Sequence, residues 1–271
     1  MARENLIPLQ GDITEPNFGL SEVPKDIHAI HHIAGIHRLG KDKDGSIWRT
    51  NVEGTRNVLK FCLEHNINRL YFTSTAYTWE CNTYGLSKIK NEKEIAEYSR
   101  KHGLKATIFK PSVIMGTKEH PYPGHFSQFV LAVIKIHQRA EIIRRKMEGT
   151  LRLPILEPVF RVKGNPQGKL NLIAVDRVAE AMAGIDGLGT FWITNPSPPT
   201  LEELVEWAGE FIMVKLKIEP EFKPTPIEAA FQKMSTAFEP YLQGDDFRSD
   251  LKEPCPITRE FIYETIKTSL L

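Results

Sequence analysis

The sequence has little cysteine, no long apolar run and almost no net charge, and each of these absences excludes a class of protein. Its three cysteines, Cys62, Cys81 and Cys255, show neither C-x-x-C nor metal-type spacing, and an odd number argues against a disulfide framework. We therefore expect a reducing, cytoplasmic setting. No apolar run approaches the roughly 18 residues of a spanning helix, and the polar N-terminus lacks a secretory signal pattern, so we expect no membrane span.

The charges almost cancel, because 35 basic residues face 34 acidic ones and leave a formal net charge of +1. Such a chain has no overall field to attract nucleic acid, so we expect a small-molecule substrate and no nucleic-acid partner. Four histidines, His28, His31, His32 and His37, crowd one segment without an acidic or cysteine partner at metal-site spacing. We expect no metal site.

Short apolar runs alternate with amphipathic stretches through the first two-thirds of the chain, which is typical of a parallel sheet flanked by helices. The expected strands are residues 6–9, 26–33, 69–74 and 105–109, and the expected helices are residues 47–64 and 84–101. Four β-to-α units in this order predict a doubly wound, Rossmann-like α/β fold with a parallel sheet.

The composition of the chain changes after Gly116, where a segment rich in Pro, Gly and His precedes an expected helix over residues 127–147. Such an insertion usually builds substrate-binding surface. We divide the chain into a cofactor-binding core (1–116), an insertion contributing to a substrate lobe (117–170), a return to the core (171–197) and a smaller C-terminal substrate lobe (198–271).

Two helix starts can be read in this second part of the chain. Asp176 follows an expected strand over residues 171–175 and is the expected N-cap of the next helix. Another strand is expected over residues 191–194. Thr200 and Glu203 then form a capping box for a helix over residues 201–211.

The strongest chemical signal is Tyr84-Gly-Leu-Ser-Lys88 at the start of a helix, one strand after a hydroxyl cluster that ends at Thr75. Residues four apart share one helix face, so the ammonium of Lys88 can approach the phenol of Tyr84 and favour its phenolate. Such a tyrosine can exchange a proton with a substrate oxygen as hydride moves, while Thr75 holds that oxygen. A Y-x-x-x-K pair alone is typical of a helix surface, but the preceding strand favours catalysis.

Seven short segments occur in order over about two-thirds of the chain. They are GDITEPNFGL (11–20), HHIAG (31–35), NVEGT (51–55), STAY (74–77), YGLSK (84–88), KPSVIMG (110–116) and LIAVD (172–176). In this order they resemble the extended short-chain dehydrogenases/reductases, the NAD-dependent epimerase/dehydratase superfamily, and especially their thioester-reductase and fatty-acyl-reductase branch. The resemblance implies an oxidoreductase that uses NADP or NAD, with NADP slightly favoured. Many relatives pair through helices like 47–64 and 84–101, so a homodimer is a candidate assembly.

The resemblance also assigns residues to the cofactor. The implied cofactor-binding residues are Asp12, Ile13, Ala34, Gly35, Asn51, Tyr84, Lys88, Pro111, Ser112 and Val113. Asp12 would accept from the adenine amino group and Ile13 would pack on the ring, while Ala34 and Gly35 would let the backbone approach the ribose and phosphates. Asn51, opening a helix, would fix the active-site geometry.

The remaining three residues, Pro111, Ser112 and Val113, would form the wall beside the nicotinamide carboxamide. Taken singly, two of the assigned residues also fit plainer roles. Asp12 is typical of a turn and Asn51 of a helix cap.

Two features depart from the family pattern. No G-x-x-G-x-x-G stands between a first strand and a first helix, where backbone amides bind the pyrophosphate, and the sequence opens at what the resemblance makes the third strand. A chain without that unit should bind a dinucleotide poorly and carry an exposed sheet edge. The second departure is the interval of nine residues from Thr75 to Tyr84, which is much shorter than the family's loop. It can reach roughly 30 Å when extended, so the site can close, but it is too short to form the loop that usually covers the substrate.

Three functions follow from these observations. The leading hypothesis is an NAD(P)-dependent reductase with Tyr84 as general acid. The GDITEP-x-F-G-L and STAY segments favour an acyl thioester or aldehyde as its substrate, with a carrier- or CoA-bound form as a candidate. The second is a sugar-nucleotide epimerase or dehydratase of the same class. The third, favoured by the missing glycine loop, is a non-catalytic nucleotide-binding regulatory relative.

Overall fold

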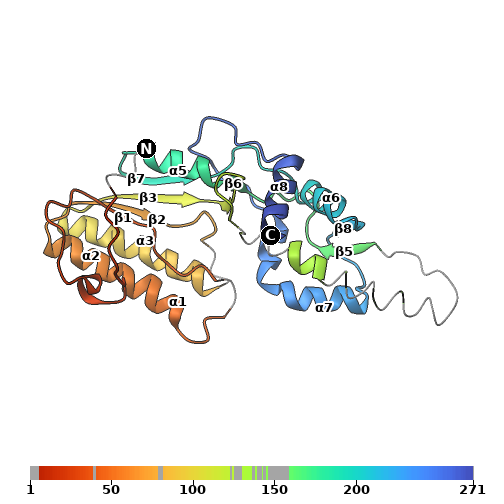
Figure 1. Ribbon diagram of the computed structural model, residues 1–271, viewed down its shortest axis with the longest axis horizontal. Helices are drawn as coiled ribbons and strands as arrows, with labels where there is room; N and C mark the ends of the chain where they lie inside the picture. The colour runs from red at the N-terminus through yellow and green to blue at the C-terminus, as the bar shows by residue number, and fades with distance from the viewer. Residues whose placement is uncertain are drawn as a thin grey trace. The chain divides into compact units, whose positions relative to one another are not determined.

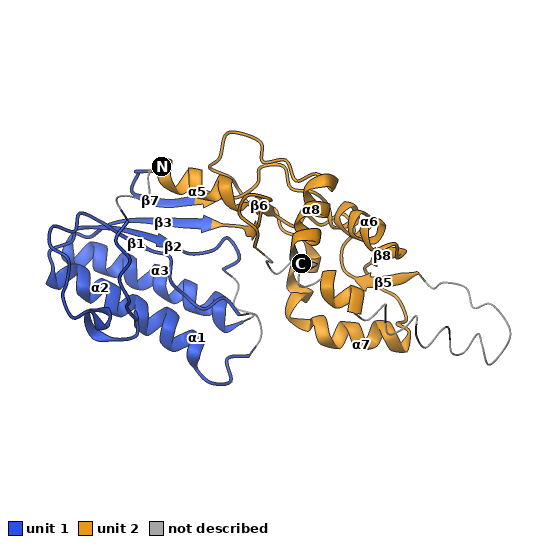
Figure 2. Cartoon of the chain, in the orientation of Figure 1, with its two compact units in different colours: residues 1–110, 186–191 blue, residues 111–185, 192–271 orange. Residues whose placement is uncertain are grey.

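The computed structural model describes residues 6–38, 41–78, 82–122, 124, 130–135, 138, 142, 145 and 159–270. The chain divides into two compact units (Figure 2). Unit 1 holds residues 1–110 and 186–191, and unit 2 holds residues 111–185 and 192–271. Each unit is described by itself.

A sheet with the strand order β1-β2-β3-β7 forms the centre of unit 1. Its strands are β1 (Ile30–His32), β2 (Arg69–Thr73), β3 (Lys105–Pro111) and β7 (Gly189–Ile193). The pairs β1–β2 and β2–β3 are parallel, and Leu70 stands opposite both Ile30 and Ala106. The predicted α/β fold with a parallel sheet is confirmed.

Two long helical stretches pack against one face of this sheet (Figure 1). The first runs through α1 (Ser46–Trp48), the π-helical turn η3 (Arg49–Glu53) and α2 (Gly54–Glu64), and the second is α3 (Thr83–His102). The core between helices and sheet consists of Val58, Leu59, Phe61, Cys62, Ile67, Leu70, Phe72, Ile95 and Leu104. Alternate residues of β2 enter this core because side chains along a strand point to opposite faces.

The prediction of a strand over residues 6–9 was wrong. These residues adopt no strand, and Leu6, Ile7 and Leu9 are 76%, 84% and 56% exposed. An apolar pattern forms a strand only where another strand supplies hydrogen-bond partners, and in the described sheet β1 stands at the end of the order and pairs with β2 alone. The segment is held instead through a short 3-10 turn, η2 (Pro16–Gly19), whose Phe18 ring lies 4.5 Å from that of Phe61.

Unit 2 contains two parallel pairs of strands, β4 with β6 and β5 with β8. These strands are β4 (Val113–Met115), β5 (Phe160–Lys163), β6 (Leu172–Ala174) and β8 (Leu216–Glu219). Its helices are α5 (Val175–Gly184), α6 (Leu201–Ile212), α7 (Pro226–Ser235), the 3-10 segment η4 (Thr236–Gln243) and α8 (Arg259–Leu270). Within the expected helix over residues 127–147, residues 130–135 are helical, and most of the remainder lies outside the described residues.

The two helix starts predicted in unit 2 had different outcomes. The capping box at Thr200 and Glu203 is confirmed, with each side chain accepting from the other residue's backbone N–H. Asp176 is not an N-cap, because Ala174 takes that position and Asp176 lies inside the first turn of α5. Its carboxylate accepts from Thr117 Oγ1 at 2.8 Å and contacts His120. The carboxylate is thus bound to residues distant in sequence and not to the backbone N–H groups of the first helical turn.

None of the described helices is long and apolar enough to cross a membrane.

Candidate active site

The proposed catalytic residues lie after the carboxyl end of β2 and at the start of α3. Thr75 is two residues beyond β2, and Tyr84 is the second residue of α3. Asn82 fixes the start of the helix, since its Oδ1 accepts from the Gly85 N–H at 2.8 Å. Tyr84 and Lys88 therefore share one helix face at the end of the sheet where ligands of such folds bind.

Lys88 is a buried cation held between α3 and β2. Its Nζ donates to the Thr73 carbonyl at 2.8 Å and lies 5.8 Å from the centroid of the Tyr84 ring. Only 5% of the residue is exposed, and burial lowers the pKa of Lys88 to about 8, although the charge of Glu92 opposes this shift. The structure thus brings together the ammonium and the phenol that the Y-x-x-x-K spacing places on one face.

Gly35 also lies close to the Lys88 ammonium. It lies three residues beyond the end of β1, and a Cβ added there would stand 3.1 Å from Asn51 Oδ1 and 3.8 Å from Lys88 Nζ. Ala34 and Gly35 are both exposed residues. Gly35 therefore lies close to Asn51 and Lys88, where a side chain would crowd the Asn51 Oδ1 atom.

Asn51 does not open or cap its helix, as its sequence position had suggested, but lies buried within the π-turn η3. Its Oδ1 accepts from the Ile36 N–H at 2.7 Å, and its Nδ2 donates to the Ile36 carbonyl at 3.1 Å and to Ser87 Oγ at 3.0 Å. Ser87 in turn donates to the Tyr84 carbonyl at 2.7 Å. Asn51 thus ties the exit of β1 to the turn of α3 that carries Tyr84, as π-turns often do at functional sites.

A second chain of buried polar groups, which the sequence did not reveal, binds the backbone carbonyl of Asn51. The Asn51 carbonyl accepts from Thr55 Oγ1 at 2.6 Å and from Asn91 Nδ2 at 2.9 Å. Since the Thr55 hydroxyl donates its hydrogen to that carbonyl, it must accept from His32 Nε2 at 2.9 Å, which fixes the histidine tautomer. Burial, aided by the Lys88 charge, lowers the pKa of His32 to about 3. The sequence feature that could have indicated this contact is the four-residue spacing from Asn51 to Thr55, which places both residues on one helix face.

Asp12 is the predicted residue whose observed setting differs most from its expected role. Its Oδ1 accepts from both the backbone N–H and the hydroxyl of Thr14 at 2.8 Å, and these bonds lower the pKa of the exposed carboxyl. This is a side-chain turn, the plainer of the two interpretations. Ile13 packs against Gly54, where an added Cβ would meet its Cδ1 at 2.8 Å.

Thr75 is buried, with its Oγ1 accepting from the Tyr77 N–H at 3.2 Å. Pro111 ends β3, and Ser112 and Val113 follow within unit 2. The Ser112 and Val113 N–H groups donate to the carbonyls of Ile193 and Asn171, both at 3.1 Å. Within the described part of the chain, the buried Ser112 hydroxyl has no hydrogen-bond partner.

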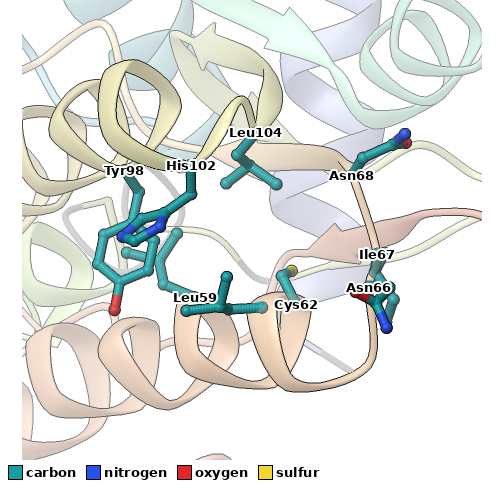
Figure 3. A pocket seen from close by; sticks show the side chains of 9 residues that line it. Leu59, Cys62, Asn66, Ile67, Asn68, Tyr98, His102 and Leu104 are labelled. Carbon is teal, nitrogen blue, oxygen red and sulfur yellow. The ribbon is translucent and has the colours of Figure 1, made fainter.

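A separate pocket lies at the opposite end of the strands (Figure 3). Its lining includes Leu59, Cys62, Ile67, Asn68, Tyr98 and His102. Because Asn68 precedes β2 whereas Thr75 follows it, this pocket is not the candidate active site. Burial raises the pKa of the Cys62 thiol to about 11, so the pocket offers no reactive thiolate near neutral pH.

Two protein-family models match the chain. The 3-beta hydroxysteroid dehydrogenase/isomerase family matches residues 1–111, and the male sterility protein family matches residues 79–182. A curated relative, short-chain dehydrogenase/reductase family 42E member 1 of Danio rerio, is 32% identical over 207 residues, or 66% of this chain and 47% of the relative. The matched families and this relative place the similarity of the chain within the extended short-chain dehydrogenase/reductase superfamily. The chain spans about half the length of that relative.

Solved structures of low sequence identity show the same fold. The terminal R domain from the myxalamid PKS-NRPS biosynthetic pathway is 20% identical with a TM-score of 0.67, covering 97% of this chain and 74% of that one. A UDP-glucose 4-epimerase of Thermus thermophilus, in complex with NAD, is 18% identical with a TM-score of 0.57, covering 99% and 88%. The predicted Rossmann-like architecture is confirmed, and the superfamily is one that binds NAD(P).

The Asn51 side chain generates a stability prediction. Asn51→Ala removes three hydrogen bonds, one buried and two part-buried, and takes from the Ile36 N–H and carbonyl their Asn51 partners, so we expect a loss of about 2–3 kcal/mol in the free energy of unfolding. Urea denaturation followed by circular dichroism measures it. Asn57→Ala, which removes a single bond from Nδ2 to the Ile13 carbonyl, serves as the control. Equal losses in the two variants would contradict the assignment.

Lys88 generates a prediction about pH. Its pKa of about 8 in the folded protein lies below the ordinary 10.5, so the unfolded chain binds more protons between these values. The free energy of unfolding of the wild type should therefore rise relative to that of Lys88→Met as the pH increases from 8 to 10.5. Urea titrations at several pH values measure the difference, with the exposed Lys60→Met as the control. A constant difference across this window would contradict the buried, weakened charge of Lys88.

Proposed function

We propose that this chain is the part of an NAD(P)-dependent oxidoreductase that carries the proton-transfer groups, with Tyr84 as general acid or base toward a carbonyl or alcohol. The observation that carries the proposal is the buried Lys88 ammonium, fixed on the Thr73 carbonyl and 5.8 Å from the Tyr84 ring. A cation beside a phenol stabilises its ionised form, and in this proposal the Tyr84 Oη exchanges a proton with the substrate oxygen.

The residues around Lys88 fit a nicotinamide cofactor. A side chain at position 35 would crowd Asn51 Oδ1 and stand beside Lys88 Nζ, so glycine allows the backbone to come close to both. Lys88 uses one N–H donor on Thr73, and an ammonium has three. We assign Gly35, Asn51 and Lys88 to holding the cofactor, with Ala34, Pro111, Ser112 and Val113 as further contacts; Asp12 and Ile13 stay proposed for the adenine end. When bound, the nicotinamide would supply or accept hydride.

Thr75 and Tyr84 complete the proposed chemistry. Thr75 would donate its hydroxyl hydrogen to the substrate oxygen, while its Oγ1 remains fixed by the Tyr77 N–H. The Tyr84 Oη would deliver a proton to the same oxygen during reduction, and would remove one during oxidation. Two donors on one oxygen stabilise the negative charge that develops there.

For the substrate we propose an acyl thioester or aldehyde, free or bound to a carrier or CoA. The GDITEP-x-F-G-L and STAY segments, the match of residues 79–182 to the male sterility protein family and the fold shared with a terminal R domain support this choice. Similarity to a UDP-glucose 4-epimerase supports the second candidate, a sugar-nucleotide epimerase or dehydratase. An assay of both product types separates them. NADP as the preferred cofactor, a cytoplasmic setting and a homodimer remain proposals.

Replacing the phenol tests the role of Tyr84. Tyr84→Phe removes only the hydroxyl, so we expect turnover to fall by roughly 10²–10⁴-fold while cofactor affinity changes little. Steady-state kinetics and fluorescence titration with NADPH and NADH measure the two effects. Tyr98→Phe, on the same helix but in the separate pocket, should leave both unchanged. Retained turnover in Tyr84→Phe would remove Tyr84 from this role, and a wild type that binds neither cofactor would exclude both enzyme hypotheses.

The charge of Lys88 predicts a pH profile. Because the protonated form assists Tyr84, kcat/KM should fall as the pH rises through about 8, the pKa of Lys88. In Lys88→Arg a cation persists to much higher pH, so whatever activity remains should lack this alkaline limb. An unchanged limb in Lys88→Arg would show that another group titrates.

A further inference from the structure

A second charged residue of α3, Glu92, lies one helical turn after Lys88 and reaches the same part of unit 1. Its carboxylate accepts from the Ser74 hydroxyl and from Lys110 Nζ, which lies 2.9 and 3.1 Å from its two oxygens. The Lys110 side chain is 6% exposed and that of Glu92 is 23% exposed. Three elements, α3, β3 and the segment after β2, thus meet in one largely buried ion pair.

This ion pair fixes the residue immediately before Thr75. The Ser74 N–H donates to the Phe109 carbonyl of β3 at 2.8 Å, while its hydroxyl is held by Glu92 of α3. One residue earlier, the Thr73 carbonyl is held by Lys88. Two successive residues are therefore bound to two side chains of the helix that carries Tyr84, which sets the position of Thr75 relative to that helix.

Glu92 also acts on Lys88 through its charge. It raises the pKa of Lys88, against the larger lowering caused by burial. In the described part of the chain, the other ionisable groups beside Lys88 or Glu92 are Tyr84 on α3, His32 on β1, which is neutral above a pKa of about 3, and Lys110 on β3, which pairs with Glu92. Of these Lys110 is the opposing cation, so the net effect of the pair depends on both of its members.

Stability alone is a poor explanation for the pair. The desolvation of two charges offsets most of their attraction, and apolar residues of similar volume often stabilise a fold as well or better. An ion pair does supply a directed acceptor for Ser74 and a fixed negative charge one turn from Lys88, and apolar side chains supply neither.

We propose that Glu92, neutralised in part by Lys110, is a positioning residue that sets Thr75 against α3 and favours the charged form of Lys88. The inference rests on the proposed function, because it gives Thr75 and Lys88 their roles. In this role Glu92 is necessary for the rate and the pH range of the reaction, although it does not contact the substrate.

The test compares Glu92→Gln with Glu94→Gln. Glutamine keeps an acceptor for Ser74 but removes the charge, so the fold should persist, while the alkaline limb of kcat and the titration of the Lys88 ¹³Cε signal in lysine-labelled protein both move to lower pH by roughly half a unit or more. Glu94 lies on the same helix and pairs with Arg56 and Lys90, so its variant should change neither. Glu92→Ala, which also loses the tie to Ser74, should lower kcat by roughly 10- to 100-fold.

A Lys88 titration in Glu92→Gln identical to that of the wild type would overturn the proposal. Lys110→Met provides a second variant whose effect has the opposite sign, because removal of the opposing cation should move the Lys88 titration to higher pH. A shift in the same direction as in Glu92→Gln would also overturn it. The ¹³C titration needs no turnover, so an inactive wild type would contradict the proposed function without deciding the role of Glu92.

Discussion

The hydrogen bond from the Lys88 ammonium to the Thr73 carbonyl is the interaction on which the site depends. It places a cation where 5% of the residue is exposed, a position that is unfavourable unless the charge is well bonded. The same bond joins the helix carrying Tyr84 to the strand that leads to Thr75. Two separate elements are thereby joined, and the cation lies 5.8 Å from the centroid of the Tyr84 ring.

Uncharged polar side chains also fix the surroundings of Lys88. Asn51, held in a π-turn by Ile36 and Ser87, keeps the exit of β1 close to α3, and the chain through Thr55 to His32 holds Asn51 from within the core. Because His32 is buried beside Lys88 and stays neutral, it adds no second charge. The candidate site is thus built from one buried cation, a network of amides and hydroxyls, and a glycine that lies close to Asn51 and Lys88.

The sequence predicted those features that depend on local pattern. The parallel sheet, the helix that begins at Thr83 and the Tyr84–Lys88 face follow from alternation and spacing, and so does the capping box at Thr200. Features that depend on distant partners were missed or misplaced. Residues 6–9 have the pattern of a strand but no neighbour in the described sheet, and Asn51 looked like a cap because Ser87 is 36 residues away. Spacing gave no sign of the Glu92–Lys110 pair.

In the proposed function the chain carries the proton-transfer groups, and the reaction also requires hydride from the cofactor. Transfer of deuterium from [4,4-²H₂]NADPH to an aldehyde, followed by mass spectrometry of the alcohol, tests that combination most directly. The account predicts one deuterium on the carbinol carbon of the wild-type product, and formation of labelled product slower by roughly 10²–10⁴-fold with Tyr84→Phe. An alcohol formed without deuterium, or labelling at equal rates by both proteins, would contradict it.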